Sequence, residues 1–191
     1  MTKEDIIIVP HPSLRLTSNE IDEINDKITL TIDNMVSATL DWEKSRNHEV
    51  GVALAAVQIN QLLDLIIIRN NYEDKDDLKF NVYINPKVIK KYGNLIEDYE
   101  GCLSVPDIYG KVPRFSKVKI KYLDINGVER QKTFSDFYAR IIQHEIDHTK
   151  GILFIDKIKE REDAFYILNK SGKLEALKYE KDIKKNPILW K

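Results

Sequence analysis

The chain has 191 residues, of which 42% are hydrophobic and 32% charged, so it can bury a core as a single domain, 1–191. Its 30 basic and 31 acidic side chains nearly cancel, which gives no support to nucleic-acid or acidic-membrane binding. A single cysteine excludes an internal disulfide, and no apolar run approaches the length of a membrane span. We therefore expect a soluble, cytoplasmic protein without membrane association.

Helix signals precede strand signals in the first half of the chain. Thr17–Glu20 has the S/T-x-x-E form of a capping box, and isoleucines follow it at helical spacing, so a helix is predicted over 18–44. Apolar or alternating stretches then predict strands, at 52–57, 64–69 and 81–90.

The second half predicts a hairpin and a second helix. Asn126-Gly127 favours a tight turn between two strand-like stretches, 118–124 and 128–134. A further helix is predicted over 137–150, because Gly151 stands where a helix stop is expected.

The tail also has a helical pattern. After a strand-like stretch at 152–155, the residues 160–185 predict a C-terminal helical extension, which Gly172 would divide. This order of elements indicates an α+β fold rather than a doubly wound sheet. We expect antiparallel strands packed around a central helix, with an N-terminal and a C-terminal helix.

The strongest chemical signal is the segment His144–His148, which fits H-E-x-x-H inside a predicted helix. Residues four apart lie on one helix face, so His144 and His148 can bind one metal ion. Glu145 then lies where it can take a proton from a bound water. This pattern is typical of metal-dependent hydrolases, and the competing interpretation is two surface histidines on an amphipathic helix.

A catalytic metal usually has three protein ligands, so the helix needs a partner from elsewhere. His11 and His48 lie in turn-like or polar contexts that favour the surface. Cys102 is the sole thiol and a good ligand for iron or zinc, although a lone cysteine is more often a small buried residue. Gln58 follows the small, apolar run 51–57, and its amide can bind a developing oxyanion, although such a glutamine usually lies at the surface.

Three segments, taken in chain order, resemble the motifs of the peptide deformylase family. They are Gly51–Gln58 for G-x-G-L-A-A-x-Q, Glu100–Ser104 for E-G-C-L-S, and Gln143–His148 for Q-H-E-x-D-H. The resemblance covers roughly residues 5–160. It implies a metal-dependent hydrolase that removes the formyl group from N-formylmethionine at the start of newly made polypeptides and releases formate.

The resemblance also implies a role for each matching position. The metal ligands would be Cys102, His144 and His148. The catalytic groups would be Glu145 as general base and then acid, with Gln58 and the backbone N–H of Leu103 as oxyanion donors. The substrate-binding positions would be Val52, Ala53, Gly101 and Arg114, the first three pairing with the substrate backbone in strand fashion.

The implied metal is Fe²⁺, one per chain, with Zn²⁺, Ni²⁺ or Co²⁺ able to replace it. The implied partners are N-formylmethionyl nascent polypeptides and, through a C-terminal helix, the ribosome.

Two positions depart from the family pattern. Ala53 stands where a second glycine is usual, and its methyl group can narrow the formyl site. Thr149 stands where leucine commonly follows the last histidine, and we expect it to pack with only a local adjustment. Two alternatives stay open: an H-E-x-x-H metallopeptidase with a His or Glu as third ligand, and a deformylase-like protein of weak activity that binds blocked N-termini.

Overall fold

The computed structural model describes residues 1–46, 48–169 and 171–190. Within them, seven strands form one antiparallel sheet in the order β1-β2-β3-β4-β6-β7, with β5 also paired to β4. The strands are β1 Ala53–Ala55, β2 Leu65–Arg69, β3 Phe80–Cys102, β4 Val105–Leu123, β5 Glu129–Ser135, β6 Phe165–Leu168 and β7 Leu174–Ala176. The helices are α1 Asp26–Lys44 and α2 Asp136–His148, with 3-10 turns at Lys3–Asp5, Pro12–Arg15, Ala56–Ile59 and Phe154–Ile158 and a π-helical turn at Tyr179–Ile183. The expectation of an α+β fold is confirmed.

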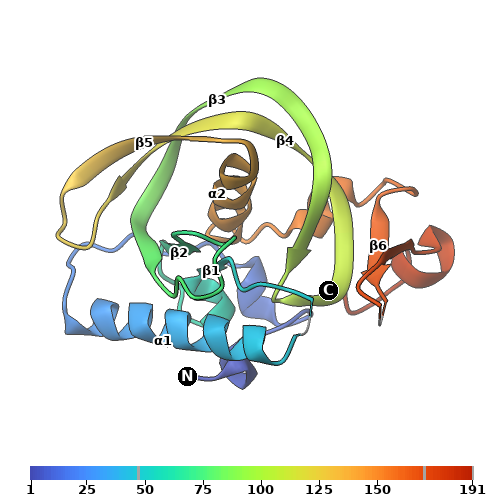
Figure 1. Ribbon diagram of the computed structural model, residues 1–191, viewed down its shortest axis with the longest axis horizontal. Helices are drawn as coiled ribbons and strands as arrows, with labels where there is room; N and C mark the ends of the chain where they lie inside the picture. The colour runs from blue at the N-terminus through green and yellow to red at the C-terminus, as the bar shows by residue number, and fades with distance from the viewer. Residues whose placement is uncertain (47, 170, 191) are drawn as a thin grey trace.

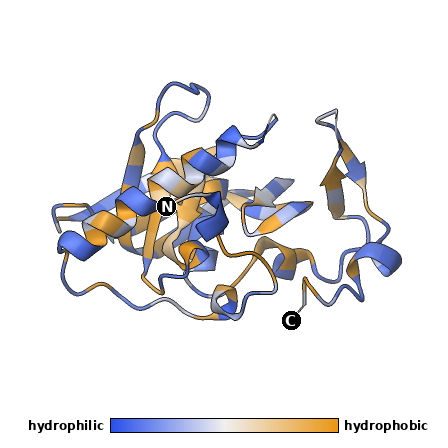
Figure 2. Cartoon of the chain, turned by 90° about the horizontal axis from the view of Figure 1, so that it is seen from below, coloured by the Kyte–Doolittle hydropathy of each residue, from blue (hydrophilic) through white to orange (hydrophobic). Residues whose placement is uncertain are grey.

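The two α-helices pack on opposite faces of the sheet at β1 and β2. Side chains alternate along β2: Ile66 and Ile68 join the cluster that contains Ile142 of α2, whereas Leu65 and Ile67 join the cluster that contains residues of α1. Both faces of β2 are therefore buried, and hydrophobic residues concentrate in the strands behind α1 (Figure 2). The long strands β3 and β4 arch over α2, which lies at the centre of the fold as predicted (Figure 1). No helix in the described residues is long and apolar enough to cross a membrane.

Helix α1 begins several residues later than predicted, because tertiary hydrogen bonds occupy the residues of the supposed capping box. The carbonyl of Asn19 accepts from the N–H of Asp64 (2.8 Å). The Asn85 side chain binds both backbone groups of Ile21, at 2.8 Å each. These contacts hold the segment extended, and Asn25 caps the helix instead.

The predicted strands differ from the structure mainly in length. β1 covers only the middle of 52–57, since the chain turns into a 3-10 helix at Ala56. β3 continues to Cys102, because it pairs with β4 along its length even where its side chains are exposed. The prediction of a strand at 152–155 is wrong, because this stretch leads into a 3-10 turn.

The predicted C-terminal helical extension is also wrong. The described part of 160–185 contains the hairpin β6–β7 and one π-helical turn. β6 pairs with β4 at Ile108–Gly110, and Phe165 is buried in the core. Gly172 does divide the segment, but as a residue with φ +76° between two strands. Pairing with a distant strand satisfies the backbone here, and local periodicity carries no information about such pairing.

Asp64 precedes β2, and its Oδ1 atom is buried without a hydrogen-bond partner among the described residues. Burial raises the pKa of Asp64 to about 6; the charge of Glu20 adds to the rise, whereas Thr149, Lys150 and Lys87 oppose it. A carboxyl whose pKa is higher in the folded than in the unfolded state destabilises the fold once it is ionised. We predict that Asp64→Asn raises the free energy of unfolding by about 1–2 kcal/mol at pH 8, allowing for partial solvent screening, and by less at pH 4.

Urea denaturation of wild type and Asp64→Asn at several pH values checks this prediction. The difference in stability should grow between about pH 4, where the unfolded carboxyl titrates, and about pH 6, where the folded one does. Asp163→Asn is the matched control, because the Asp163 side chain is 82% exposed. Equal stabilities of wild type and Asp64→Asn at pH 8 would contradict the prediction.

Candidate metal centre and active-site cavity

Helix α2 directs two imidazoles toward one point. His144 and His148 lie one turn apart on the same helix face, and their Nε2 atoms are 3.2 Å from each other. Both side chains are buried. The structure therefore places both predicted histidine ligands together on one face of α2.

Cys102 supplies a sulfur to the same point. It ends β3 just before the turn into β4, and its Sγ lies 3.2 Å from Nε2 of His148. The donor atoms of Cys102, His144 and His148 all lie within 4.8 Å of one another. His11 instead accepts a hydrogen bond from a backbone N–H in a 3-10 turn, and His48 lies on the wall of a cavity. The structure thus brings together the three predicted ligands.

The protonation of these groups fits a metal ion. Burial alone lowers the pKa of His144, but hydrogen bonds to Cys102 and Glu100 reverse this and raise that pKa well above its usual range. Burial and the charges of His144 and Arg114 lower the pKa of His148, which is neutral in consequence. A sulfur and two imidazole nitrogens are suitable donors for iron or zinc. Binding of either ion would displace the proton that His144 otherwise holds among these three groups.

A buried ion-pair network lies behind the ligands, and the sequence analysis missed it. Glu100 accepts hydrogen bonds from Arg114 (2.8 and 2.9 Å), from Arg140 (2.8 Å) and from Nδ1 of His144 (2.9 Å). Burial alone would raise the pKa of Glu100, but the bonds from Arg114 and His144 hold it well below its usual range. Because Glu100 binds Nδ1 of His144, it leaves the Nε2 atom of that ring directed toward Cys102 and His148.

Arg114 does not lie where the resemblance implied. Its side chain is 4% exposed and forms ion pairs with both Glu100 and Asp147. It is absent from the described lining of the larger cavity and borders a smaller hollow instead. This guanidinium, neutralised by two buried carboxylates, lies behind the candidate metal ligands. The sequence offered one hint of this network: Glu100 and Asp147 each lie close to a predicted ligand. Because a buried arginine needs buried anions, these two carboxylates were candidate partners for Arg114.

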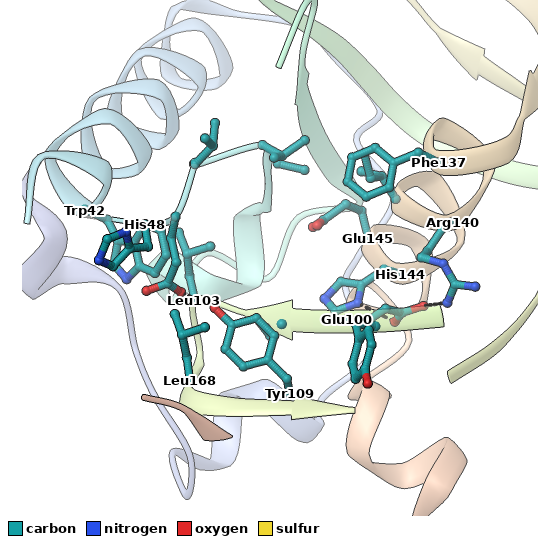
Figure 3. Close-up of a pocket in the computed structure, with 18 of the residues that line it drawn as sticks. Trp42, His48, Glu100, Leu103, Tyr109, Phe137, Arg140, His144, Glu145 and Leu168 are labelled. Carbon is teal, nitrogen blue, oxygen red and sulfur yellow. Dashed lines mark hydrogen bonds and ion pairs between the residues drawn. The ribbon is translucent and has the colours of Figure 1, made fainter. Parts of the chain in front are cut away.

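Two polar groups flank the thiol on the cavity side. Glu145 is buried, its Oε2 atom has no partner among the described residues, and burial raises its pKa to about 7. Its carboxyl projects toward the middle of the cavity (Figure 3). Oε1 of Gln58 accepts from the N–H of Ala55 (2.8 Å), which leaves Nε2 at 3.5 Å from Sγ of Cys102 and 3.1 Å from Oγ of Ser104. An acid–base group and an amide donor therefore lie beside the candidate metal ligands.

A cavity of about 410 Å³ opens in front of these groups. One end is lined by Phe137, Arg140, His144 and Glu145 of α2, and the other by Trp42, His48 and Leu168 (Figure 3). The lining also includes Val52, Ala53, Gln58, Gly101, Cys102 and Leu103. Every predicted site residue lines this one cavity except Arg114 and the buried His148.

The α+β fold and this site define a class of protein, the metal-dependent hydrolases with a single metal centre on an H-E-x-x-H helix. A thiol as the third candidate ligand distinguishes the site from a peptidase site, which normally draws a histidine or a carboxylate.

Comparisons with known proteins narrow the class. Residues 3–164 match the family model described as polypeptide deformylase. The chain is 34% identical over 163 residues to a peptide deformylase of Bradyrhizobium sp. (strain ORS 278), covering 84% of this chain and 89% of that one. Over 158 residues it is 37% identical to the peptide deformylase of Brachyspira hyodysenteriae, covering 81% and 80%.

Solved structures agree with the sequence relatives. A peptide deformylase from Plasmodium falciparum superposes with a TM-score of 0.72 at 35% identity, covering 80% of this chain and 84% of that one. One from Synechococcus elongatus, in complex with actinonin, gives 0.73 at 33% identity, covering 82% and 80%.

The chain belongs to the polypeptide deformylase family. It is a metal-dependent enzyme that removes N-formyl groups from newly made polypeptides. The resemblance stated from the three motifs is thereby confirmed, and the alternative of an H-E-x-x-H metallopeptidase is set aside.

Proposed function

We propose that Cys102, His144 and His148 hold the metal for deformylation and that Glu145 transfers the proton. The observation that carries this proposal is the meeting of three donor atoms within 4.8 Å beside a buried carboxyl oxygen that has no partner among the described residues. The proposed metal is Fe²⁺, with Zn²⁺, Ni²⁺ or Co²⁺ able to replace it, since a thiolate and two imidazoles suit all of these ions. When bound, such an ion would act as a Lewis acid and lower the pKa of a water molecule.

The substrate backbone is proposed to bind as an added strand. β1 is the end strand of the sheet and pairs only with β2 among the described residues, so its other edge is available. Val52, Ala53 and Gly101 all line the cavity. Extended peptides bind such edges through backbone hydrogen bonds, which suits an enzyme that must accept many protein N-termini.

Each remaining polar group has one proposed task. Glu145 accepts the proton of the water that attacks the formyl carbon and returns it to the leaving amine, a task that suits a pKa near 7. Nε2 of Gln58 and the backbone N–H of Leu103 donate to the oxygen that gains negative charge. The bond from Ala55 to Oε1 of Gln58 supports this assignment, because it keeps the amide N–H₂ turned toward the thiol.

Ala53 is the position on which the weak-activity alternative depends. It pairs with Ile68, and its methyl group packs in the cluster on the α2 side of the sheet. Because Ala53 is only 7% exposed and its methyl group packs in this cluster, we expect the formyl site to stay open. Wild type loaded with Fe²⁺ or Co²⁺ should release formate from formyl-Met-Ala-Ser, and Ala53→Gly should change kcat/KM by less than about tenfold.

The assay for both proteins is formate release under anaerobic conditions, with metal content measured on the same samples. Ala53→Gly should also lower the free energy of unfolding by about 0.5–1 kcal/mol, because glycine is less favourable in a strand. A gain well above tenfold in the glycine variant would support the weak-activity alternative. Absence of formate with either metal and either protein would refute the proposed function.

The nascent chain that carries N-formylmethionine is the proposed substrate in the cell, and a cytoplasmic location is proposed with it. Docking on the ribosome was expected through a C-terminal helix, which the described tail lacks. It stays a prediction from the family resemblance.

A further inference from the structure

A wall of the active-site cavity comes from a segment outside the family match. The match ends at residue 164, and the hairpin β6–β7 follows it. Leu168 and Leu174, which face each other across this hairpin, and Gly172 at its turn all line the cavity. The catalytic end of the cavity therefore lies within the residues that the family model matches, whereas this wall follows them.

The hairpin is held firmly in place. β6 pairs with β4, where Tyr166 lies opposite Tyr109. Phe165 is 1% exposed and packs in the core. At the turn, a side chain on Gly172 would come within 3.1 Å of the His48 ring, so the turn touches the segment that follows α1. The described part of the hairpin is thus fixed to the sheet by strand pairing and core packing where it lines the cavity.

The far end is mainly apolar. Trp42 and Val50 line the cavity together with the hairpin leucines. The carboxylate of Glu49 at this end already has partners: it accepts a hydrogen bond from the hydroxyl of Tyr109 (2.5 Å) and lies 3.6 Å from the guanidinium of Arg46. Arg46 in turn pairs with Asp107 (2.6 Å). Neutralised charges leave the apolar surface as the main source of binding energy for a ligand.

The far end is also continuous with the proposed substrate strand. A side chain on Gly101 would come within 2.6 Å of the Tyr109 ring, so this ring lies directly against a backbone position proposed to bind substrate. A peptide advances about 3.3 Å per residue in an extended conformation, so the side chains that directly follow formylmethionine can reach the far end of the cavity.

We propose that hairpin β6–β7, with Trp42 and Tyr109, forms a subsite for a bulky apolar side chain in the residues that directly follow formylmethionine. This inference rests on the proposed function, because it places formylmethionine at the metal end. The hairpin then gives this enzyme a preference among nascent chains, through residues that follow those matched by the family model.

Two peptide series test the subsite, formyl-Met-X-Ala and formyl-Met-Ala-X, with X as Ala, Leu, Phe, Asp or Lys. Wild type should show a kcat/KM about tenfold higher for Leu or Phe than for Ala in one series, mainly through KM. Leu168→Ala and Leu174→Gln should reduce this ratio to below about threefold. Ile167→Ala is the matched control, because Ile167 neighbours Leu168 on β6, points to the other face and is absent from the cavity lining.

The outcomes separate the two claims. Formate release without any preference in either series, or a preference that both hairpin variants keep, overturns the subsite and leaves the proposed function intact. A preference for Asp or Lys overturns its apolar character. Absence of formate from every peptide removes the proposed function itself. Melting temperatures of all variants show whether a lost preference reflects the subsite or a damaged fold, and Leu174→Gln, which keeps the side-chain size, guards against the latter.

Discussion

The Glu145→Gln variant is expected to release formate about 10²–10⁴ times more slowly than wild type while it keeps its metal. Glu145 lies beside His144 with one oxygen buried and without a partner among the described residues, and burial raises its pKa to about 7. A carboxyl of that pKa can take up and return a proton near neutrality, whereas an amide of the same shape can do neither. Its oxygens are not part of the group of three donor atoms, so the ligands should stay in place.

Steady-state kinetics and metal analysis on the same preparations check this expectation. Glu162→Gln is the control, because it makes the same change at an exposed glutamate. Fully metal-loaded Glu145→Gln with kcat within about threefold of wild type would rule out Glu145 as the group that transfers the proton.

The Cys102→Ser variant is expected to lose formate release because it loses its metal. The Cys102 sulfur lies 3.2 Å from Nε2 of His148 and is one of the three donor atoms. A serine hydroxyl is neither soft nor readily ionised, so the affinity for metal should fall by at least about 100-fold, more than the loss of an outer partner would cause. His11→Ala removes a histidine outside the group and should keep one metal per chain.

A second measurement follows from the composition. Cys102 is the only cysteine, so the rate of thiol alkylation reports on this single sulfur. Metal-loaded wild type should react slowly and chelated protein faster, because a coordinated thiolate is not a free nucleophile. A serine variant with full metal and activity, or an alkylation rate that metal removal leaves unchanged, would mean that another residue completes the site.

Local patterns predicted the parts of the site that lie on one element. The spacing of His144 and His148 places both on one face of α2 in any helical context, and the structure agrees. The network around Glu100 was missed, because it joins β3, β4 and α2 and leaves no periodic trace in the sequence. The resemblance placed Arg114 among the substrate-binding positions, and its buried ion pairs with Glu100 and Asp147 likewise join separate elements.

The α+β class, the H-E-x-x-H helix and the family could all be predicted from the sequence, since each depends on composition, helical spacing or ordered short motifs. Tertiary structure alone decided how Cys102 reaches the histidines, because a strand that runs from Phe80 to Cys102 delivers it through pairing with β4. It also decided that the tail becomes the hairpin β6–β7 beside the cavity rather than a helix. In both cases the deciding energy comes from hydrogen bonds and burial between residues far apart in the chain, which local propensity does not contain.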